Sequence, residues 1–370
     1  MRPGLSKLAF KAPASYPTHE TAAGREDITN FGIRKHRRFV AVRCWFVAAL
    51  VLGGWNPAGR AQPAPGDGKP LFTIANRRLS SSPVVISYGD MRFTDPKDTV
   101  VTNPKVRRWL VGRIAAEKPD ALLLSGDVPM RGGIAGDYAV FDSETAPWRS
   151  AGLVVIPALG NHEMYREGRE VCRDNQPVCL ENWWKAFPKL QGVRWYSVQL
   201  GGKMFVLNLD SNAPLLPGSD QAKWIQRQLA GLPRSVRFVF LNMHHPPVAD
   251  PSPETGPEAS PRPNEAALAA LLKTAPVRKR VRFIVTAAHV HNYERFLRDG
   301  IVYLVSGGGG AKPSAVQRGA DDLYRDSSEP NYHYLKFVLL EDRIEAEMIR
   351  VADPLADVPR WEVKDRFQVK

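Results

Sequence analysis

The chain of 370 residues carries a formal net charge of +13, and 44% of its residues are hydrophobic. This composition excludes an intrinsically disordered chain and allows one large domain or two ordinary ones. Residues 1–61 hold ten Lys and Arg against three Asp and Glu, which leaves 41 against 35 for the remainder. A surplus this small, spread over roughly 300 residues, does not specifically indicate nucleic-acid binding.

The N-terminal segment accounts for much of the basic excess. An apolar stretch from Phe39 to Trp55 is followed by small residues, and a basic flank precedes it: Arg34, Lys35, Arg37 and Arg38. This layout is typical of a secretory signal, so we expect residues 1–61 to be an extension with a signal peptide cleaved near Ala61. The paired arginines also allow a twin-arginine signal. Arg43 interrupts the apolar stretch, so we expect no permanent membrane span, with an uncleaved anchor as the alternative.

Export would place the folded chain in the periplasm or outside the cell, where disulfides persist. Cys44 would leave with the signal, whereas Cys172 and Cys179 flank a polar loop that contains proline. The simplest interpretation of that pair is a local disulfide. No nearby histidine or third cysteine would complete a zinc site there.

Short apolar runs alternate with amphipathic stretches beyond a Pro- and Gly-rich linker. We expect the linker at residues 62–80, the folded domain at 81–352 and a C-terminal tail at 353–370. Residues 103–120 and 219–232 have helical patterns, the second capped by Ser219 or Asp220 and closed near Gly231. Six apolar runs predict buried strands. The runs are PVVISYGD, ALLLSGD, LVVIPALGNHE, MFVLNLDSN, VRFVFLNMHHPP and VRFIVTAAHVH. Alternating strands and helices predict an α/β fold with crossover connections.

Polar residues follow these predicted strands at the point where each strand ends. They are Asp90, Asp127, Asn161, His244, His289 and His291. Ligand sites in open α/β sheets form at the carboxyl ends of the strands, so these side chains are expected to converge. Asp, Asn and His without thiolates form a ligand set suited to Zn, Mn or Fe. The set contains enough ligands for two cations, a pair that can clamp both the attacking and the leaving oxygen in phosphoryl displacement.

The same residues lie in five ordered motifs: GD at Gly89–Asp90, GDVPM at Gly126–Met130, GNHE at Gly160–Glu163, MHHP at Met243–Pro246, and AHVHNYER at Ala288–Arg295. In this order the chain resembles the calcineurin-like metallophosphoesterases, and most closely their purple acid phosphatase branch. The resemblance extends from about Pro83 to Val351. It implies a four-layer sandwich of two mixed β-sheets flanked by helices, with the catalytic domain at 81–352.

The resemblance also implies a role for each residue. Asp127 would bridge two metal ions. Asp90 and His291 would hold the first ion, and the ligands of the second would be Asn161, His244 and His289. His162 would donate a proton to a phosphate oxygen or to the leaving group. The family motif favours His244 over His245 as the ligand, with His245 behind it or near substrate. Glu163 would orient a neighbouring histidine or face solvent.

Two positions depart from the family pattern. The family usually supplies a further ligand to the first ion, either a His two residues after the first Asp or a Tyr three residues after the second; here these positions are Arg92 and Met130. An arginine is always charged and a thioether binds hard dications poorly. We therefore expect a weak first site, with Arg92 directed at a substrate phosphate through charge-assisted hydrogen bonds.

The sequence thus predicts an exported phosphoesterase that uses a dinuclear centre of Fe, Zn or Mn to hydrolyse small phosphate esters. Three alternatives stay open: a phosphodiesterase rather than a monoesterase, an acid phosphatase, and a degenerate relative that binds a phosphorylated ligand without turnover. The sequence indicates neither the substrate nor the oligomeric state.

Overall fold

The computed structural model describes residues 69–166, 180–252, 261–326 and 331–370. The predicted signal peptide lies outside these ranges, as do both cysteines of the predicted disulfide, Cys172 and Cys179. Within the described ranges, no helix is long and apolar enough to cross a membrane. The fold below is that of the chain from Lys69 onward.

One of the two β-sheets has seven strands in the order β1-β5-β6-β7-β8-β10-β9. Most neighbours are parallel, but the β5–β6 and β10–β9 pairs are antiparallel, so the sheet is mixed. In chain order its strands are β1 (Phe72–Ile74), β5 (Tyr196–Leu200), β6 (Met204–Asn208), β7 (Phe238–Asn242), β8 (Arg282–Ala287), β9 (Tyr293–Arg298) and β10 (Ile301–Ser306).

The second sheet has six strands in the order β13-β12-β11-β2-β3-β4. Strands β2, β3 and β4 are parallel, whereas β11, β12 and β13 form an antiparallel ladder against β2. Its strands are β2 (Val84–Tyr88), β3 (Ala121–Leu124), β4 (Val155–Pro157), β11 (His333–Leu339), β12 (Ile344–Val351) and β13 (Trp361–Val369).

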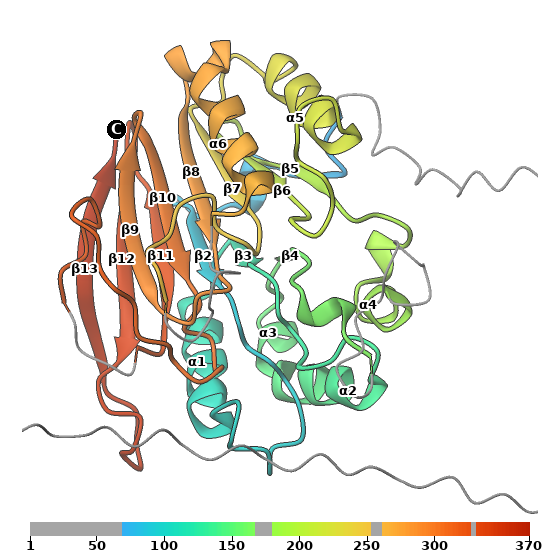
Figure 1. Ribbon diagram of the computed structural model, residues 1–370, viewed down its shortest axis with the longest axis vertical. Helices are drawn as coiled ribbons and strands as arrows, with labels where there is room; N and C mark the ends of the chain where they lie inside the picture. The colour runs from blue at the N-terminus through green and yellow to red at the C-terminus, as the bar shows by residue number, and fades with distance from the viewer. Residues whose placement is uncertain (1–68, 167–179, 253–260, 327–330) are drawn as a thin grey trace, which may run out of the picture. The chain divides into compact units, whose positions relative to one another are not determined.

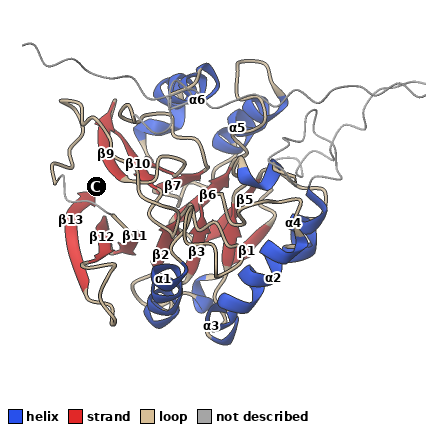
Figure 2. Ribbon diagram, turned by 60° about the horizontal axis from the view of Figure 1, so that its bottom comes forward, coloured by secondary structure: helices blue, strands red, loops and turns tan. Residues whose placement is uncertain are grey.

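Helices cover the outer faces of the two sheets, as Figures 1 and 2 show. The helices beside the seven-stranded sheet are α5 (Asp220–Ala230) and α6 (Pro263–Thr274), and those beside the six-stranded sheet are α1 (Pro104–Glu117), α2 (Ala135–Glu144) and α3 (Ala146–Ser150). The remaining helices are α4 (Glu181–Ala186) and the short 3-10 turns η1 (Asn76–Arg78), η2 (His162–Met164), η5 (Pro188–Leu190) and η7 (Pro276–Lys279). Two mixed sheets between helices are the predicted sandwich, so the fold class is confirmed.

The alternation of side chains along β7 explains why both faces of its sheet are covered. Phe240 packs in the core between the sheets, where its ring lies 5.3 Å from that of Phe337 on β11. Val239 and Leu241 point the other way and pack in the cluster that contains Trp224 of α5. Because successive residues of a strand face opposite sides, a strand buried on both sides needs an unbroken apolar run. The sequence FVFLN supplies one.

The two helices that the sequence predicted are present. The side chain of Ser219 caps α5 by accepting the Ala222 N–H, and Gly231 follows its last turn. Helix α1 begins after Asn103, whose side chain accepts the Val106 N–H. The segment we expected as a C-terminal tail contains β13, which pairs along its length with β12.

Candidate metal centre

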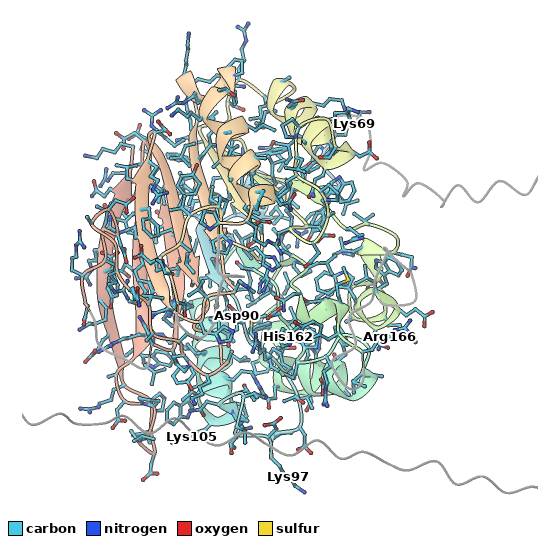
Figure 3. The ribbon with its side chains drawn as sticks, viewed as in Figure 1. Lys69, Asp90, Lys97, Lys105, His162 and Arg166 are labelled. Atoms are coloured by element: carbon cyan, nitrogen blue, oxygen red, sulfur yellow. The ribbon has the colours of Figure 1, made fainter. Side chains whose placement is uncertain are left out.

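All six predicted ligands lie beyond the carboxyl ends of parallel strands, on one edge of the two facing sheets. Asp90 follows β2, Asp127 follows β3 and Asn161 follows β4, all from the six-stranded sheet. His244 follows β7 in the seven-stranded sheet, and the β8–β9 loop carries His289 and His291. Figure 3 labels Asp90 and His162 at this edge. The predicted convergence of strand ends is therefore present.

Four ligand atoms form a tight group around the ring of His244. Its Nε2 lies 2.8 Å from Asn161 Oδ1, 3.2 Å from His289 Nδ1 and 3.3 Å from Asp127 Oδ1. Its Nδ1 lies 2.9 Å from the Ser125 carbonyl, so the proton sits on Nδ1 and the Nε2 lone pair points into the group. Ligands bonded to one metal ion at about 2.1 Å stand roughly 3 Å apart. We call this group the His244 position.

Asn161 is oriented for this group by Tyr165. The amide nitrogen of Asn161 donates to the Tyr165 hydroxyl at 3.1 Å, which turns the amide oxygen towards the histidines. Burial lowers the pKa of His289 to about 3 and also lowers the pKa of His244. Both rings are therefore neutral at pH 7, which is the form that ligates metals.

A second group contains Asp90 and His291. The His291 Nδ1–H donates to the Lys312 carbonyl at 2.9 Å, which leaves its Nε2 lone pair directed towards Asp90 Oδ1 at 3.7 Å. Both atoms are buried and have no hydrogen-bond partner among the described residues. Unpaired buried carboxylate and imidazole atoms are costly, and a cation between them would satisfy both. We call this group the Asp90 position.

Several non-glycine residues at the centre have strained, left-handed backbone conformations. Asp90, Arg92, Asp127 and His289 all have left-handed φ values, between 48° and 72°. Only two other non-glycine residues of the described ranges share this feature, both outside the centre. Such conformations cost about 1 kcal/mol or more each and persist where a site requires them.

Two glycines allow the strand ends to approach one another. A Cβ at Gly160 would lie 2.3 Å from Asp127 Oδ1, and one at Gly126 would lie 2.7 Å from His244 Nδ1. Gly126 also has a φ of +86°, which favours glycine independently. Any side chain at either position would push a ligand out of place.

Comparison with known proteins identifies the family. The family model for calcineurin-like phosphoesterases matches residues 100–293, just over half of the chain. This chain belongs to the calcineurin-like phosphoesterase family. The match includes every predicted ligand except Asp90. No curated protein sequence matches the chain significantly.

Solved structures share the fold of this chain. A purple acid phosphatase from yellow lupin (Lupinus luteus) seeds superposes with a TM-score of 0.60 at 18% identity, over 79% of this chain and 54% of the lupin chain. The chain thus spans about half the length of that enzyme. For a dimetal phosphatase from Danio rerio the TM-score is 0.51 at 14% identity, over 81% and 99% of the two chains. For PhoD it is 0.53 at 12% identity, over 83% and 71%.

The ligand atoms define a candidate metal centre with two positions in this chain of the calcineurin-like phosphoesterase family. The side chains of this chain fit such a centre, because the His244 position offers two imidazoles, a carboxylate and an amide oxygen. The unpaired atoms of Asp90 and His291 mark the other position.

Arg92 and Met130 occupy the positions where this chain departs from the usual family pattern. The guanidinium of Arg92 contacts Asp127 Oδ2, at 3.2 Å from Nη2 and 3.4 Å from Nε. We expected this group to point at a substrate phosphate; in the structure its hydrogen bonds go to Asp127. The Met130 side chain is buried, and its carbonyl oxygen lies 2.6 Å from His162 Nδ1. Met130 thereby fixes the tautomer of His162.

His162 lies beside Asp127, and its role in proton transfer stays a prediction. With the proton on Nδ1 held by Met130, Nε2 is free and lies 3.7 Å from Asp127 Oδ2. Burial lowers the pKa of His162 to about 4, and the Asp127 charge acts in the opposite direction. The ring is therefore neutral at pH 7 and charged only in acid.

Glu163 has a role that the sequence did not reveal. We expected it to orient a histidine or to face solvent, but its carboxylate is fully buried and accepts three backbone N–H groups. They belong to Gly160 at 2.6 Å, Val128 at 2.8 Å and Asp127 at 3.1 Å. Burial and the Asp127 charge raise the pKa of Glu163 to about 8. Glu163 thus joins the loop that carries Asp127 to the loop that carries Asn161.

His244, not His245, supplies the ring that faces the ligands. His245 stacks on His289 with ring centroids 4.3 Å apart, and its Nδ1 lies 2.8 Å from Ser211 Oγ. It also lies within ligand distance of the same group of imidazoles. His245 thus packs against the rings of both His244 and His289, and its role stays a prediction.

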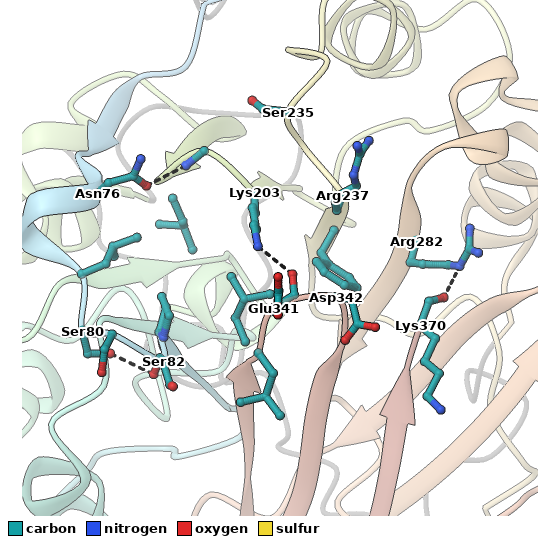
Figure 4. Close-up of a pocket in the computed structure, with 18 of the residues that line it drawn as sticks. Asn76, Ser80, Ser82, Lys203, Ser235, Arg237, Arg282, Glu341, Asp342 and Lys370 are labelled. Atoms are coloured by element: carbon teal, nitrogen blue, oxygen red, sulfur yellow. Dashed lines mark hydrogen bonds between the residues drawn. The ribbon is translucent and has the colours of Figure 1, made fainter.

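Two other features lie apart from the centre. Asp250, Glu294 and Asp322 form a buried carboxylate cluster, in which Arg318 Nη1 lies 2.5 Å from Asp322 Oδ2. A cavity of about 1150 Å³ opens at the amino ends of the same parallel strands (Figure 4). Pro83, Phe238 and Arg282 line it just before or at the start of β2, β7 and β8. Since the ligands follow the opposite strand ends, this cavity is not the candidate active site.

Proposed function

We propose that this chain is an exported phosphoesterase that hydrolyses small phosphate monoesters at the centre formed by the His244 and Asp90 positions. The carrying observation is the group of four ligand atoms around His244, which lies beside the buried atoms Asp90 Oδ1 and His291 Nε2. The family membership supports the reaction class.

The bound ions would supply Lewis acidity and a nucleophile at neutral pH. The chain's own residues then act around the substrate. Asp127 divides its oxygens between the two positions, with Oδ1 towards His244 and Oδ2 towards Arg92. The Ser125 carbonyl keeps the Nε2 lone pair of His244 directed at the ligand group, and Glu163 fixes the backbone that carries Asp127.

His162 and Arg92 are the proposed substrate contacts. His162 Nε2 is free to take up a proton and to pass it to the leaving group. Nη1 of Arg92 has no hydrogen-bond partner among the described residues, and the side chain is 15% exposed. That remaining edge of the guanidinium is available to a phosphate oxygen.

The direct test is hydrolysis of an aryl phosphate monoester and an aryl diester by the full chain, with metal content measured on the same samples. We expect activity on the monoester, which Asn161→Ala abolishes together with bound metal. Asn76→Ala is the matched control, since Asn76 lines the cavity at the far edge, and it should change neither. Metal binding without turnover on either ester would overturn the proposal in favour of a ligand-binding relative.

Two specific observations favour alternatives. The contact between Arg92 and Asp127 favours a centre with reduced turnover. The low pKa of His162, about 4, favours an acid phosphatase, because a general acid must be protonated. A pH–rate profile separates them: an acid phosphatase loses activity as the pH rises above about 4 to 5, whereas a binding protein shows none at any pH.

Export is proposed from the sequence pattern of residues 34–61. N-terminal sequencing of the protein from periplasmic and culture fractions tests it. A start near Gln62 supports the proposal, whereas an intact N-terminus in the cytoplasmic fraction contradicts it.

A further inference from the structure

Arg92 places a positive charge at the Asp90 position. Its guanidinium makes two hydrogen bonds to Asp127 Oδ2, the oxygen that His244 does not use. An oxygen of Asp90, an oxygen of Asp127 and a ring nitrogen of His244 lie within 4.8 Å of one another. The Arg92 charge acts on Asp90 and on His291, the other two ligands of this position. Arg92 therefore contacts one of the three residues that would hold the first ion, and its charge acts on the other two.

The backbone of Arg92 is held firmly enough for this contact to be built in. Its N–H donates to the Asp127 carbonyl at 2.9 Å, and its φ is 48°. Its own carbonyl accepts from Arg107 Nη1 at 3.1 Å. Arg107 is fully buried and is anchored in turn by Glu144, 2.9 Å from Nε. A left-handed backbone fixed on both sides aims this side chain at the centre.

The two positions differ in whether a cationic side chain already bonds to one of their ligand atoms. At the His244 position three ligand atoms lie 2.8 to 3.3 Å from His244 Nε2, and Arg92 bonds to none of these four atoms. At the Asp90 position, Asp127 Oδ2 already accepts two hydrogen bonds from the guanidinium of Arg92. Two cations on one carboxylate oxygen within a buried site repel strongly, because little water screens them.

We propose that Arg92 is an internal cation that closes the Asp90 position: it competes with a metal ion for Asp127 Oδ2. The resting centre then holds one divalent ion, at the His244 position. A second ion enters only when the guanidinium leaves Asp127. The inference rests on the proposed function for the presence of a metal, but it concerns the number of ions and not the reaction.

Metal stoichiometry tests the proposal on the full chain, stripped of metal and titrated with Mn²⁺. Calorimetry gives the affinity of each ion, and electron paramagnetic resonance distinguishes an isolated Mn²⁺ from a coupled pair. The native chain should bind one ion tightly and show the isolated signal at one equivalent. In Arg92→Gln, which keeps the length and removes the charge, the second ion should bind about tenfold or more tightly than in the native chain.

Two further variants sharpen the result. Arg92→His supplies an imidazole in place of the cation and should give the coupled spectrum at two equivalents. Arg366→Gln removes an exposed cation of β13, which pairs with Glu347, and should leave both affinities unchanged. Circular dichroism melts check that each variant is folded.

A native chain that binds two ions with equal affinity and a coupled spectrum would overturn the proposal. So would an unchanged second affinity in both folded Arg92 variants, or no metal binding at all. Failure of the proposed function gives a different result. If the stoichiometry changes with Arg92 as described while no ester is hydrolysed, Arg92 is the internal cation of a binding protein and the hydrolase proposal is wrong.

Discussion

The His244 position and the Asp90 position lie side by side at one edge of two sheets, share Asp127, and differ in what the protein offers to a cation. At the first, three ligand atoms lie 2.8 to 3.3 Å from a fourth, His244 Nε2. At the second, two unpaired atoms stand 3.7 Å apart, and the shared carboxylate is engaged by Arg92. A dinuclear fold can thus carry two positions of unequal strength, and a single side chain sets the difference.

The largest expected effect is that of removing the complete position. His244→Ala deletes the ring around which the other ligand atoms are grouped, so bound metal should be lost and kcat/KM on an aryl phosphate should fall about 1000-fold. Metal analysis and steady-state kinetics measure both quantities. Activity within a few-fold of the native chain would mean that this position is not the essential one.

His291→Ala tests the other side of the comparison. Since the Asp90 position is expected to be filled weakly, its loss should lower kcat/KM by only about tenfold and leave one ion bound. The measurements are the same as for His244→Ala. An equal loss of metal and activity in the two variants would show that the positions are equivalent.

Glu163→Gln tests the shared support behind both positions. A glutamine places its NH₂ group against N–H donors that the carboxylate now accepts, so at least one buried donor loses its partner. We expect about 2 kcal/mol less stability in urea denaturation and weaker metal binding, because the loop of Asp127 is no longer fixed. Glu163→Asp, which keeps the carboxyl group, should recover part of both. Unchanged metal affinity in Glu163→Gln would limit Glu163 to a purely stabilising role.

A further prediction concerns His333, a buried histidine outside the centre. Its ring lies between Ser306 Oγ and the Asn331 carbonyl, and burial lowers its pKa to about 4. The unfolded state binds the proton first, near pH 6.5, so the stabilisation is complete above that pH and is lost as the pH falls towards 4.

The difference in unfolding free energy between pH 7 and pH 4 should therefore be about 3 kcal/mol smaller in His333→Gln than in the native chain. Denaturant melts at the two pH values measure it, and Asn76→Ala is the control with native pH dependence. An unchanged difference in His333→Gln would show that His333 does not titrate in this range. Acid loss of the native fold would then belong to the histidines of the centre.

Much of the centre could be predicted because its signals are local. Each ligand follows an apolar run, and the carboxyl ends of parallel strands meet by the geometry of the sheet. The helix over 219–232 was equally visible from its cap and its closing glycine. In the described ranges, His244 rather than His245 faces the other ligands, as the family motif indicated.

The contacts that were missed join residues far apart in the chain. Arg92 follows β2 and bonds to Asp127, which follows β3. Nothing in either local sequence indicates that the guanidinium bonds to this carboxylate rather than to a substrate phosphate. Glu163 bonds to N–H groups some 35 residues away, a partner set that only the folded loops reveal. The ladder of β12 and β13 had a local signal, the alternation in WEVKDRFQV, which we assigned to a tail.

The most direct test of the unequal centre is a crystal structure of the native chain grown with excess Mn²⁺, with the anomalous signal measured at each position. We predict strong density beside His244, Asn161 and His289, weak density between Asp90 and His291, and the guanidinium of Arg92 on Asp127 Oδ2. Equal anomalous peaks at the two positions, with Arg92 turned away from Asp127, would contradict the claim that Arg92 closes the first position.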